Sequence, residues 1–83
     1  MSSTYYIRMV IDIANVHEKF SQKLQIERVK NKLSQEKLAE LANIHRTTVS
    51  AIERKAMSPS LETICCIANA LNLSLQEIFD FNF

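Results

Sequence analysis

The sequence predicts an all-α protein in which helices enclose a single core. The chain has 83 residues, which is enough for one modest hydrophobic core. It contains no glycine and one proline, whereas sheet proteins need such residues in their turns. Hydrophobic residues make up 47% of the chain and charged residues 23%, the composition of an ordinary globular domain.

The first sixteen residues form an amino-terminal extension, and residues 17–83 form the main domain. The stretch TYYIRMVIDI is rich in aromatic and β-branched residues, which favours a strand. A helical stripe runs through the same stretch and beyond it, at Met9, Ile13, Val16, Phe20 and Leu24. Helix and strand are therefore equally supported for the first fifteen residues. From Val16 onward the stripe predicts one helix that runs to about Lys32.

The segment from Leu33 to Asn43 has clear signals for the start and the end of a helix. Ser34 can cap the first free amides, and Glu36 lies favourably at the positive end of the helix dipole. Asn43 is a suitable left-handed residue for the end. The apolar positions that should face the core are Leu38, Leu41 and Ala42.

Another short helix should begin at His45. Val49 and Ile52 would face inward, while polar side chains take the opposite or flanking faces. These polar side chains are Arg46, Thr47, Ser50 and Arg54. Two short helices joined by a turn of this length form a helix-turn-helix.

The only proline marks the next loop, Ser58-Pro59-Ser60, and two further helices follow it. Apolar residues at helical spacing predict the first of them, at Leu61, Ile64, Ile67, Ala68 and Leu71. Asn72 should end that helix. Ser74 can cap a last helix from Leu75 to about Phe81.

Charge is distributed unevenly along the chain, although the net charge is only +1. Residues 17–55 carry nine lysine or arginine residues against five acidic ones, whereas residues 56–83 carry three acidic residues and no basic one. A basic middle joined to an acidic end suggests that one face meets a polyanion.

No set of residues suggests a catalytic or metal site, so we expect neither enzymatic activity nor a cofactor. Cys65 and Cys66 are adjacent, which makes a disulfide between them unfavourable, and no cysteine or histidine spacing fits a zinc site. His17 and His45 are the only histidines and belong to no metal-spaced set. No stretch has the length and hydropathy of a membrane span or a signal peptide, so we expect a cytoplasmic protein without membrane contact.

The helix-turn-helix predicts how DNA would be read. In this motif the first helix crosses the phosphate backbone and the second inserts its amino end into the major groove. Arg46 at that end can make a bidentate contact with guanine. The hydroxyl groups of Thr47, Thr48 and Ser50 can reach base edges or phosphates. We expect these four residues to read the bases.

Residues of about 20 to 80 resemble the XRE-type, or lambdoid-repressor, helix-turn-helix family in the pattern LSQEKLAELANIHRTTVSAIER…SPSLETICCIANAL. The resemblance implies a compact five-helix bundle with base contacts along the second helix of the motif and a phosphate contact from Gln35. It also implies a structural salt bridge between Arg28 and Glu53. The full set of expected phosphate contacts is Gln35, Lys37, Arg54, Lys55, Ser58 and Ser60.

Three positions depart from the pattern of that family. Lys32 and Lys55 stand where glycine usually ends a helix, and Glu27 stands where an apolar residue is usual. Lys55 should either lengthen the second helix of the motif, the recognition helix, or strain its end. Ile26 and Val29 add apolar surface, which we expect to pack against the amino-terminal extension.

The segment HRTTVSAIER in a short chain looks most like the controller proteins of type II restriction-modification systems. The resemblance implies a homodimer that binds a palindromic operator in double-stranded DNA and activates or represses transcription, with RNA polymerase as a further candidate partner. The alternative is a phage-type repressor or an antitoxin-type autoregulator that acts partly through protein contacts.

The last helix should supply the contact between two copies, because it carries more apolar bulk than so short a segment can bury. The expected interface residues are Leu75, Ile78, Phe79, Phe81 and Phe83. Among them, Leu75 and Ile78 are also expected to close the core of the monomer, so the three phenylalanines are the better candidates for partner contact. Tyr5, Tyr6 and Ile7 offer a second candidate surface.

Overall fold

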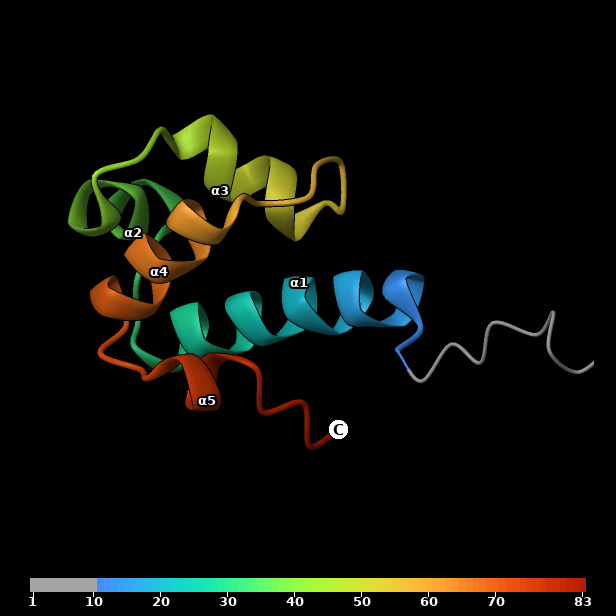
Figure 1. Ribbon diagram of the computed structural model, residues 1–83. Coiled ribbons are helices and arrows are strands. Elements are labelled where there is room, and N and C mark those ends of the chain that lie inside the picture. Colours follow the sequence, from blue (N-terminus) through green and yellow to red (C-terminus); the bar gives the residue numbers. More distant parts are fainter. Residues whose placement is uncertain (1–10) are drawn as a thin grey trace, which may run out of the picture.

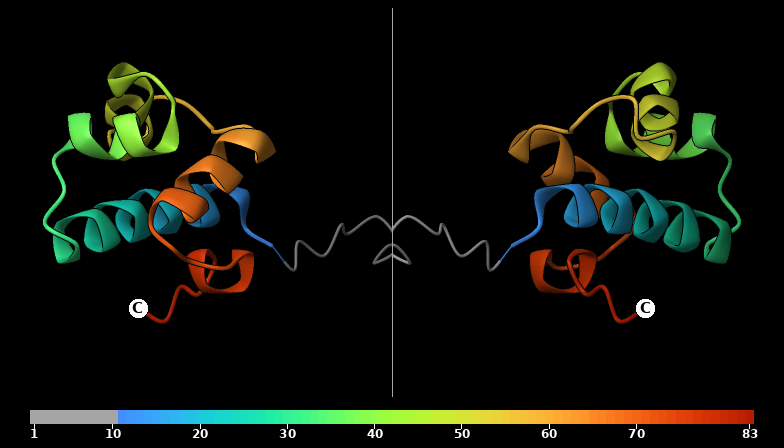
Figure 2. Two further views of the ribbon diagram at one scale, coloured as in Figure 1. Left: turned by 90° about the vertical axis from the view of Figure 1, so that its left-hand side faces the viewer. Right: turned by 90° about the vertical axis from the view of Figure 1, so that its right-hand side faces the viewer.

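The computed structural model describes residues 11–83, and these residues form five α-helices. They are α1 (Ile13–Lys30), α2 (Gln35–Ala42), α3 (Arg46–Glu53), α4 (Leu61–Ala70) and α5 (Leu75–Ile78). The predicted all-α bundle is therefore confirmed. The long helix α1 lies across the middle, with α2, α3 and α4 on one side and α5 on the other (Figure 1). Figure 2 shows the same layers from two further directions.

Helix α1 begins inside the predicted extension. Asp12 caps it by accepting a hydrogen bond from the backbone amide of Asn15 at 3.3 Å. Of the first fifteen residues, which the sequence left ambiguous, 13–15 are thus helical, and residues 1–10 lie outside the described range. The helix passes through the boundary that the sequence suggested at residue 16. It ends at Lys30, slightly before the expected Lys32.

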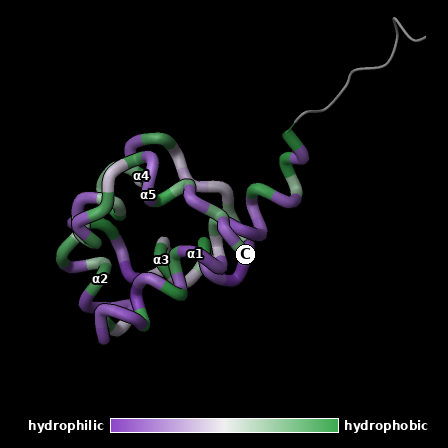
Figure 3. Tube along the Cα trace, turned by 90° about the horizontal axis from the view of Figure 1, so that it is seen from below, coloured by the Kyte–Doolittle hydropathy of each residue, from purple (hydrophilic) through white to green (hydrophobic). Residues whose placement is uncertain are grey.

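The inner faces of the helices enclose one hydrophobic core. Its largest fully buried side chains are Leu24, Leu38, Val49, Ile52, Ile67 and Ile78. In Figure 3 hydrophobic and hydrophilic stretches alternate along the trace, as expected for amphipathic helices packed around a core. Every helix therefore contributes at least one fully buried side chain to the same core.

Two leucines of the predicted helical patterns, Leu41 and Leu61, lie on the surface, and of these only Leu41 was expected to face the core. Leu41 is exposed, because the buried face of α2 runs through Leu38, Ala39 and Ala42, and Leu41 lies about 100° around the helix from the centre of that face. Leu61 is exposed because it is the first residue of α4 and precedes the part of that helix that packs on the core.

Glu27, which departs from the family pattern, is buried and paired. Its carboxylate lies 3.1 Å from the ammonium group of Lys23, one helical turn earlier on α1. Both side chains are largely shielded from solvent, with exposed fractions of 14% for Lys23 and 10% for Glu27. The pair explains how the fold accommodates a charge where an apolar residue is usual, because a buried charge needs a partner.

Serine residues cap three of the helices. The hydroxyl oxygens of Ser34, Ser60 and Ser74 accept hydrogen bonds from the backbone amides three residues further on, at 2.9, 3.2 and 3.0 Å. At α5 the carboxylate of Glu77 also accepts a hydrogen bond from the Ser74 amide at 2.8 Å, which completes a capping box. That backbone hydrogen bond, together with the Ser74 side chain, lowers the pKa of Glu77. The cap is therefore complete at neutral pH and weakens as the pH falls through the lowered pKa.

Four of the helices are followed by a residue with left-handed backbone, and none of these residues is glycine. They are Lys32, Asn43, Lys55 and Asn72, with φ angles of 59°, 57°, 62° and 58°. The Cβ of any residue other than glycine crowds the backbone there, but the short polar side chain of asparagine can form local hydrogen bonds that offset this cost, whereas that of lysine cannot. Lys55 therefore does not lengthen α3, which ends at Glu53, but occupies a strained position just after it.

The backbone hydrogen bonds after α3 show why position 55 must be left-handed. The Lys55 amide donates to the Ile52 carbonyl at 3.0 Å, and the Ala56 amide donates to the Ala51 carbonyl at 2.8 Å. This pair of bonds is the Schellman arrangement, which requires a left-handed residue at its turning point. Lys32 holds the same place after α1, where the Leu33 amide donates to the Arg28 carbonyl at 3.0 Å.

We predict that Lys55→Gly stabilises the protein. Glycine removes a left-handed strain of roughly 1–2 kcal/mol, and the greater freedom of glycine in the unfolded chain cancels about 0.4–1 kcal/mol of that gain. The midpoint of urea unfolding should therefore rise. Lys55→Ala is the matched control, because it removes the same charge but keeps the Cβ, and it should bring no gain. An equal rise for both variants would show that charge, not backbone strain, is responsible.

Candidate nucleic-acid interface

Helices α2 and α3 form the predicted helix-turn-helix. The chain turns between them at Asn43, whose left-handed conformation ends α2, while the Ile44 amide donates to the Ala39 carbonyl at 3.0 Å. The half-buried side chain of Ile44 packs against the core, and His45 takes the capping position of α3. The turn thus holds the amino end of α3 at a fixed angle to α2 (Figure 1).

The outward face of α3 carries most of the predicted base-reading residues. Val49 and Ile52 are fully buried and anchor the opposite face. Arg46 and Thr47 are exposed and Ser50 is half-buried, and helical geometry places these three side chains on the same outward side. Thr48 is half-buried on the flank, about 100° further round than Thr47. Arg46, Thr47 and Ser50 therefore form one outward-facing group, and Thr48 lies beside this group.

Two further residues, which the sequence did not single out, border this group. Ala51 lies one turn after Thr47 on the outward side and is half-buried. Its methyl group is of the kind that contacts thymine methyl groups. His45 is exposed and makes no side-chain capping bond. Projecting the helix on a wheel would have indicated Ala51, but no sequence signal indicates that the His45 side chain is free.

The carboxyl end of α3 is fastened to α1 by buried polar contacts. The Ser21 hydroxyl, almost fully buried, donates to the Ile52 carbonyl at 2.7 Å and lies 3.0 Å from the His17 carbonyl. One turn earlier on α1, the His17 Nε2 donates to the carbonyl of Met57 at 2.9 Å, in the loop after α3. These contacts fix one end of the recognition helix, while its amino end carries Arg46.

Arg28 and Glu53 form the predicted salt bridge. The Nε of Arg28 donates to one carboxylate oxygen of Glu53 at 2.7 Å, and a terminal nitrogen donates to the other at 3.0 Å. The second terminal nitrogen donates to the Leu33 carbonyl at 2.7 Å. The exposed fractions are 13% for Arg28 and 5% for Glu53, so the pair is largely buried. The hydrogen bonds to Glu53 raise the pKa of Arg28 further above its already high ordinary value.

Gln35, the first predicted phosphate contact, is held by the same carboxylate. Its side-chain nitrogen donates to Glu53 at 2.9 Å, which fixes the amide at the start of α2. An amide nitrogen carries two hydrogens, so one remains for a phosphate oxygen. Glu53 therefore links the salt bridge to a residue that we expect at the DNA backbone.

The other predicted phosphate contacts lie on the surface, several of them in weak local pairs. Lys37 is 3.1 Å from Glu40, Lys55 is 4.0 Å from Glu18, and Arg54 donates to the Ser50 hydroxyl at 3.2 Å. Exposed pairs of this kind contribute little to stability, so these cations can turn toward DNA at small cost. Ser58 is exposed, and the Ser60 hydroxyl is engaged as the cap of α4.

Some of the residues predicted to contact a second copy are buried in the monomer, and others are exposed. Ile78 is fully buried in the monomer core, so it has no surface to offer a partner. Leu75 is half-exposed, and the expectation that it closes the core is wrong, because it sits at the first position of α5. Helix α5 ends at Ile78 rather than near Phe81, since the aromatic residues after it follow an extended path along α1.

A series of aromatic contacts, one tilted and two edge-to-face, holds the carboxyl-terminal segment on α1. The rings of Phe20 and Phe79, Phe79 and Phe81, and Phe81 and Phe83 have centroids 5.8, 6.0 and 6.3 Å apart. Phe20 is buried, whereas Phe79 and Phe83 remain exposed by 41% and 47%. The series thus leads from the core to an apolar surface made of Leu75, Phe79 and Phe83.

Two further properties concern the described residues. Among residues 11–83, no three histidine, cysteine, aspartate or glutamate side chains gather as metal ligands would. None of the helices in that range is both long enough and apolar enough to cross a membrane.

The sequence and the fold both match known proteins. The helix-turn-helix family model matches residues 24–78. Control protein C.SmaI of Serratia marcescens is 36% identical over 64 residues, which are 77% of this chain and 76% of that protein. Control protein C.BamHI of Bacillus amyloliquefaciens is 41% identical over 68 residues, 81% and 84% of the two chains. The crystal structure of the restriction-modification controller protein C.AhdI from Aeromonas hydrophila superposes with a TM-score of 0.72 at 37% identity, covering 75% of this chain and 94% of that one.

We predict that Arg28→Ala destabilises the protein by about 3 kcal/mol, because it leaves the buried Glu53 carboxylate without its cation. The Leu33 carbonyl loses its donor as well. Thermal unfolding followed by circular dichroism measures the change. Lys37→Ala removes a cation from an exposed pair and serves as the control, with an expected loss below about 1 kcal/mol. A melt of Arg28→Ala that coincides with the parent would contradict the structural role of this pair.

Proposed function

The chain belongs to the helix-turn-helix family of DNA-binding transcriptional regulators, and from this premise we propose that it is the controller protein of a restriction-modification system. Its relatives C.SmaI and C.BamHI are control proteins, which supports this proposal over a phage-type repressor or an antitoxin-type autoregulator. The same relatives agree with the expectation that the chain is not an enzyme.

The observation that carries the DNA-binding role is the outward face of α3. Arg46 at its amino end, with Thr47 and Ser50 beside it, presents donors and acceptors of the kind that read base edges in the major groove. The fully buried Val49 and Ile52 fix that face relative to the rest of the domain. A rigid helix with an exposed polar face is the arrangement that base readout requires.

The surrounding residues supply the contacts that position the protein on the duplex. Gln35 at the start of α2, which is bonded to Glu53 in the last turn of α3, and Lys55 just after α3 are proposed to bind the phosphate backbone. Such contacts carry no sequence information but provide much of the affinity. Binding should therefore weaken steeply as the salt concentration rises.

Two copies of the chain are proposed to bind one operator. A single recognition helix reads only a few base pairs, and dimers of this motif place two such helices about 34 Å apart, one helical turn of DNA. The exposed surface of Leu75, Phe79 and Phe83 is the proposed contact. A two-fold dimer implies a palindromic operator, whose occupancy blocks RNA polymerase or favours its binding.

We predict that Arg46→Ala lowers affinity for the operator by about 1–3 kcal/mol and relaxes specificity at one base pair. The probe is a DNA fragment from upstream of the chain's own gene, and fluorescence anisotropy is measured on that fragment and on a scrambled one. Lys55→Ala is the comparison, because loss of a phosphate contact should weaken both fragments alike and reduce the salt slope by about 1. If Arg46→Ala kept the parent's preference between the fragments, the proposed readout would be wrong.

We also predict that Leu75→Lys dissociates the dimer. The side chain is half-exposed at the start of α5, so the change should place a charge in the contact without disturbing the core. Sedimentation velocity over a dilution series measures the dissociation constant. Leu61→Lys, at an exposed leucine on α4, is the control and should leave the dimer intact. If the parent and Leu75→Lys sedimented equally, the dimer contact would have to lie on another face.

A further inference from the structure

The loop of residues 54–60 joins the end of α3 to the start of α4. It carries most of the predicted phosphate contacts, namely Arg54, Lys55, Ser58 and Ser60. In Figure 1 the loop extends beyond the end of α3 and turns back above α1. Because phosphate contacts set the position of a protein on the duplex, the loop must keep one course if these contacts are to act together.

The backbone of this loop is joined to α1 by the side chain of His17. The Nε2 of His17 donates to the Met57 carbonyl at 2.9 Å, and a carbonyl oxygen can only accept, so the imidazole carries a hydrogen on this nitrogen. Among residues 11–83, no other side chain of α1 donates to the backbone of this loop. Met57 lies between Lys55 and Ser58 in the chain, so its fixed carbonyl limits the course of both neighbours.

Packing beneath the loop is incomplete. A cavity of about 120 Å³ lies between the loop and α1, and its lining includes Ser58 and Pro59 of the loop and Val16 and Phe20 of α1. Side chains that border such a space lack contacts on that side. His17 lines the same cavity, so its hydrogen bond joins the two elements where close packing does not.

The next residue on α1 makes a much looser contact with the loop. The Glu18 carboxylate lies 4.0 Å from the Lys55 ammonium group, and the exposed fractions of these two side chains are 54% and 49%. An exposed pair of this kind is weak and easily exchanged. The Lys55 side chain can therefore turn toward a phosphate, whereas the backbone from which it extends is held by His17.

We propose that His17 is a positioning residue for DNA binding, which holds the loop in the course that brings Lys55 and Ser58 to the phosphate backbone. The proposal rests on the proposed DNA-binding function. His17 is half-buried against the loop and acts through it, without touching DNA. A loop that is ordered before binding avoids the entropy cost of being ordered on the duplex.

The test replaces His17 and measures how DNA binding depends on salt. His17→Leu removes the donor but keeps apolar bulk. Its affinity should fall about tenfold for the operator fragment and the scrambled fragment alike, because phosphate contacts carry no sequence information. Between about 50 and 200 mM salt, the slope of log affinity against log salt should decrease by about 1. His17→Gln, which can donate from a similar reach, should restore both.

A double variant tests whether His17 acts through Lys55. Lys55→Ala alone should reduce the salt slope by about 1. If His17 acts by placing this cation, the double variant of His17→Leu and Lys55→Ala should lose no more slope than either single variant.

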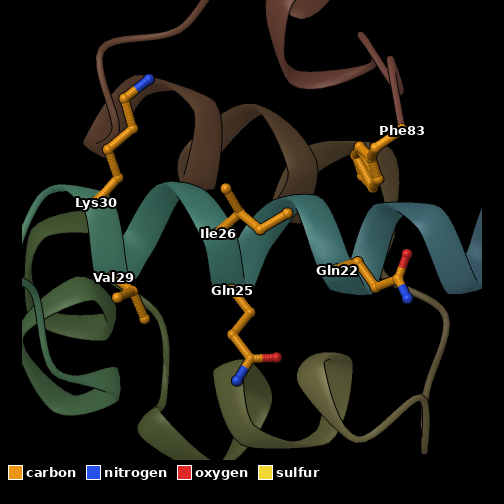
Figure 4. Close-up of a pocket in the computed structure, with 6 residues that line it drawn as sticks. All are labelled: Gln22, Gln25, Ile26, Val29, Lys30 and Phe83. Atoms are coloured by element: carbon orange, nitrogen blue, oxygen red, sulfur yellow. The ribbon is translucent and has the colours of Figure 1, made fainter.

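Two control variants separate positioning from general effects on the fold. Gln22→Leu makes a similar change on α1, but Gln22 lines a groove with Ile26 and Phe83 (Figure 4) and makes no hydrogen bond to the loop among the described residues. Ile67→Val removes a methylene group from the core on α4 and so lowers stability away from the loop. Both should keep the salt slope of the parent at a temperature where circular dichroism shows every variant folded.

Four outcomes would overturn the proposal while the parent still binds DNA. His17→Leu could keep the parent's slope, His17→Gln could bind as weakly as His17→Leu, the double variant could lose a second unit of slope, or Ile67→Val could lower the slope as much as His17→Leu does. If the parent bound neither fragment at low salt, the proposed DNA-binding function itself would be wrong, and this role of His17 with it.

Discussion

The ion pair between Arg28 and Glu53 connects the parts of the molecule that must keep a fixed relation. Arg28 belongs to α1 and Glu53 to the last turn of α3, so the pair joins the central helix to the recognition helix. Through further hydrogen bonds it also fixes the Leu33 carbonyl in the turn before α2 and the Gln35 amide at the start of α2. A largely buried pair is weak evidence for stability by itself, but here each of the three guanidinium nitrogens of Arg28 donates to an acceptor, either the Glu53 carboxylate or the Leu33 carbonyl. Its main effect is to set geometry.

The recognition helix is therefore fixed at one end and accessible at the other. Ser21, His17 and Glu53 hold its carboxyl end and the loop after it through contacts with α1. Its amino end has no comparable polar anchor in the described residues, since His45 makes no side-chain cap. In the proposed complex that end meets the bases, and the exposed side chains of Arg46 and Thr47 are available for this contact. Buried anchors near the reading residues reduce the ordering cost that binding would otherwise incur.

Local signals in the sequence predicted most of this fold, and contacts between distant residues explain what was missed. Ser34, Ser60 and Ser74 each cap a helix as expected, because capping depends on residues only three positions apart. The contact of Ser21 with Ile52 joins residues far apart in the chain, and no periodicity indicates it. Periodicity also misplaced Leu41, since it identifies a helical face but not which edge of that face its neighbours cover. In the candidate site, the helical pattern predicted the exposure of Arg46 and Thr47. It did not predict the hydrogen bond that the Gln35 side chain donates to Glu53.

The lysines in left-handed positions show how local strain relates to the proposed function. Asn43 and Asn72 solve the same conformational problem with a residue that tolerates it better, so the fold does not require lysine at such a place. At position 55 lysine places a cation directly after the recognition helix, where the proposed phosphate contacts gather. Local strain that persists beside a binding surface is consistent with selection for binding over stability. Lys32 has the same strain in the turn between α1 and α2 but is outside the proposed set of contacts. The proposed phosphate contact would account for the lysine at 55, whereas the lysine at 32 has no structural reason.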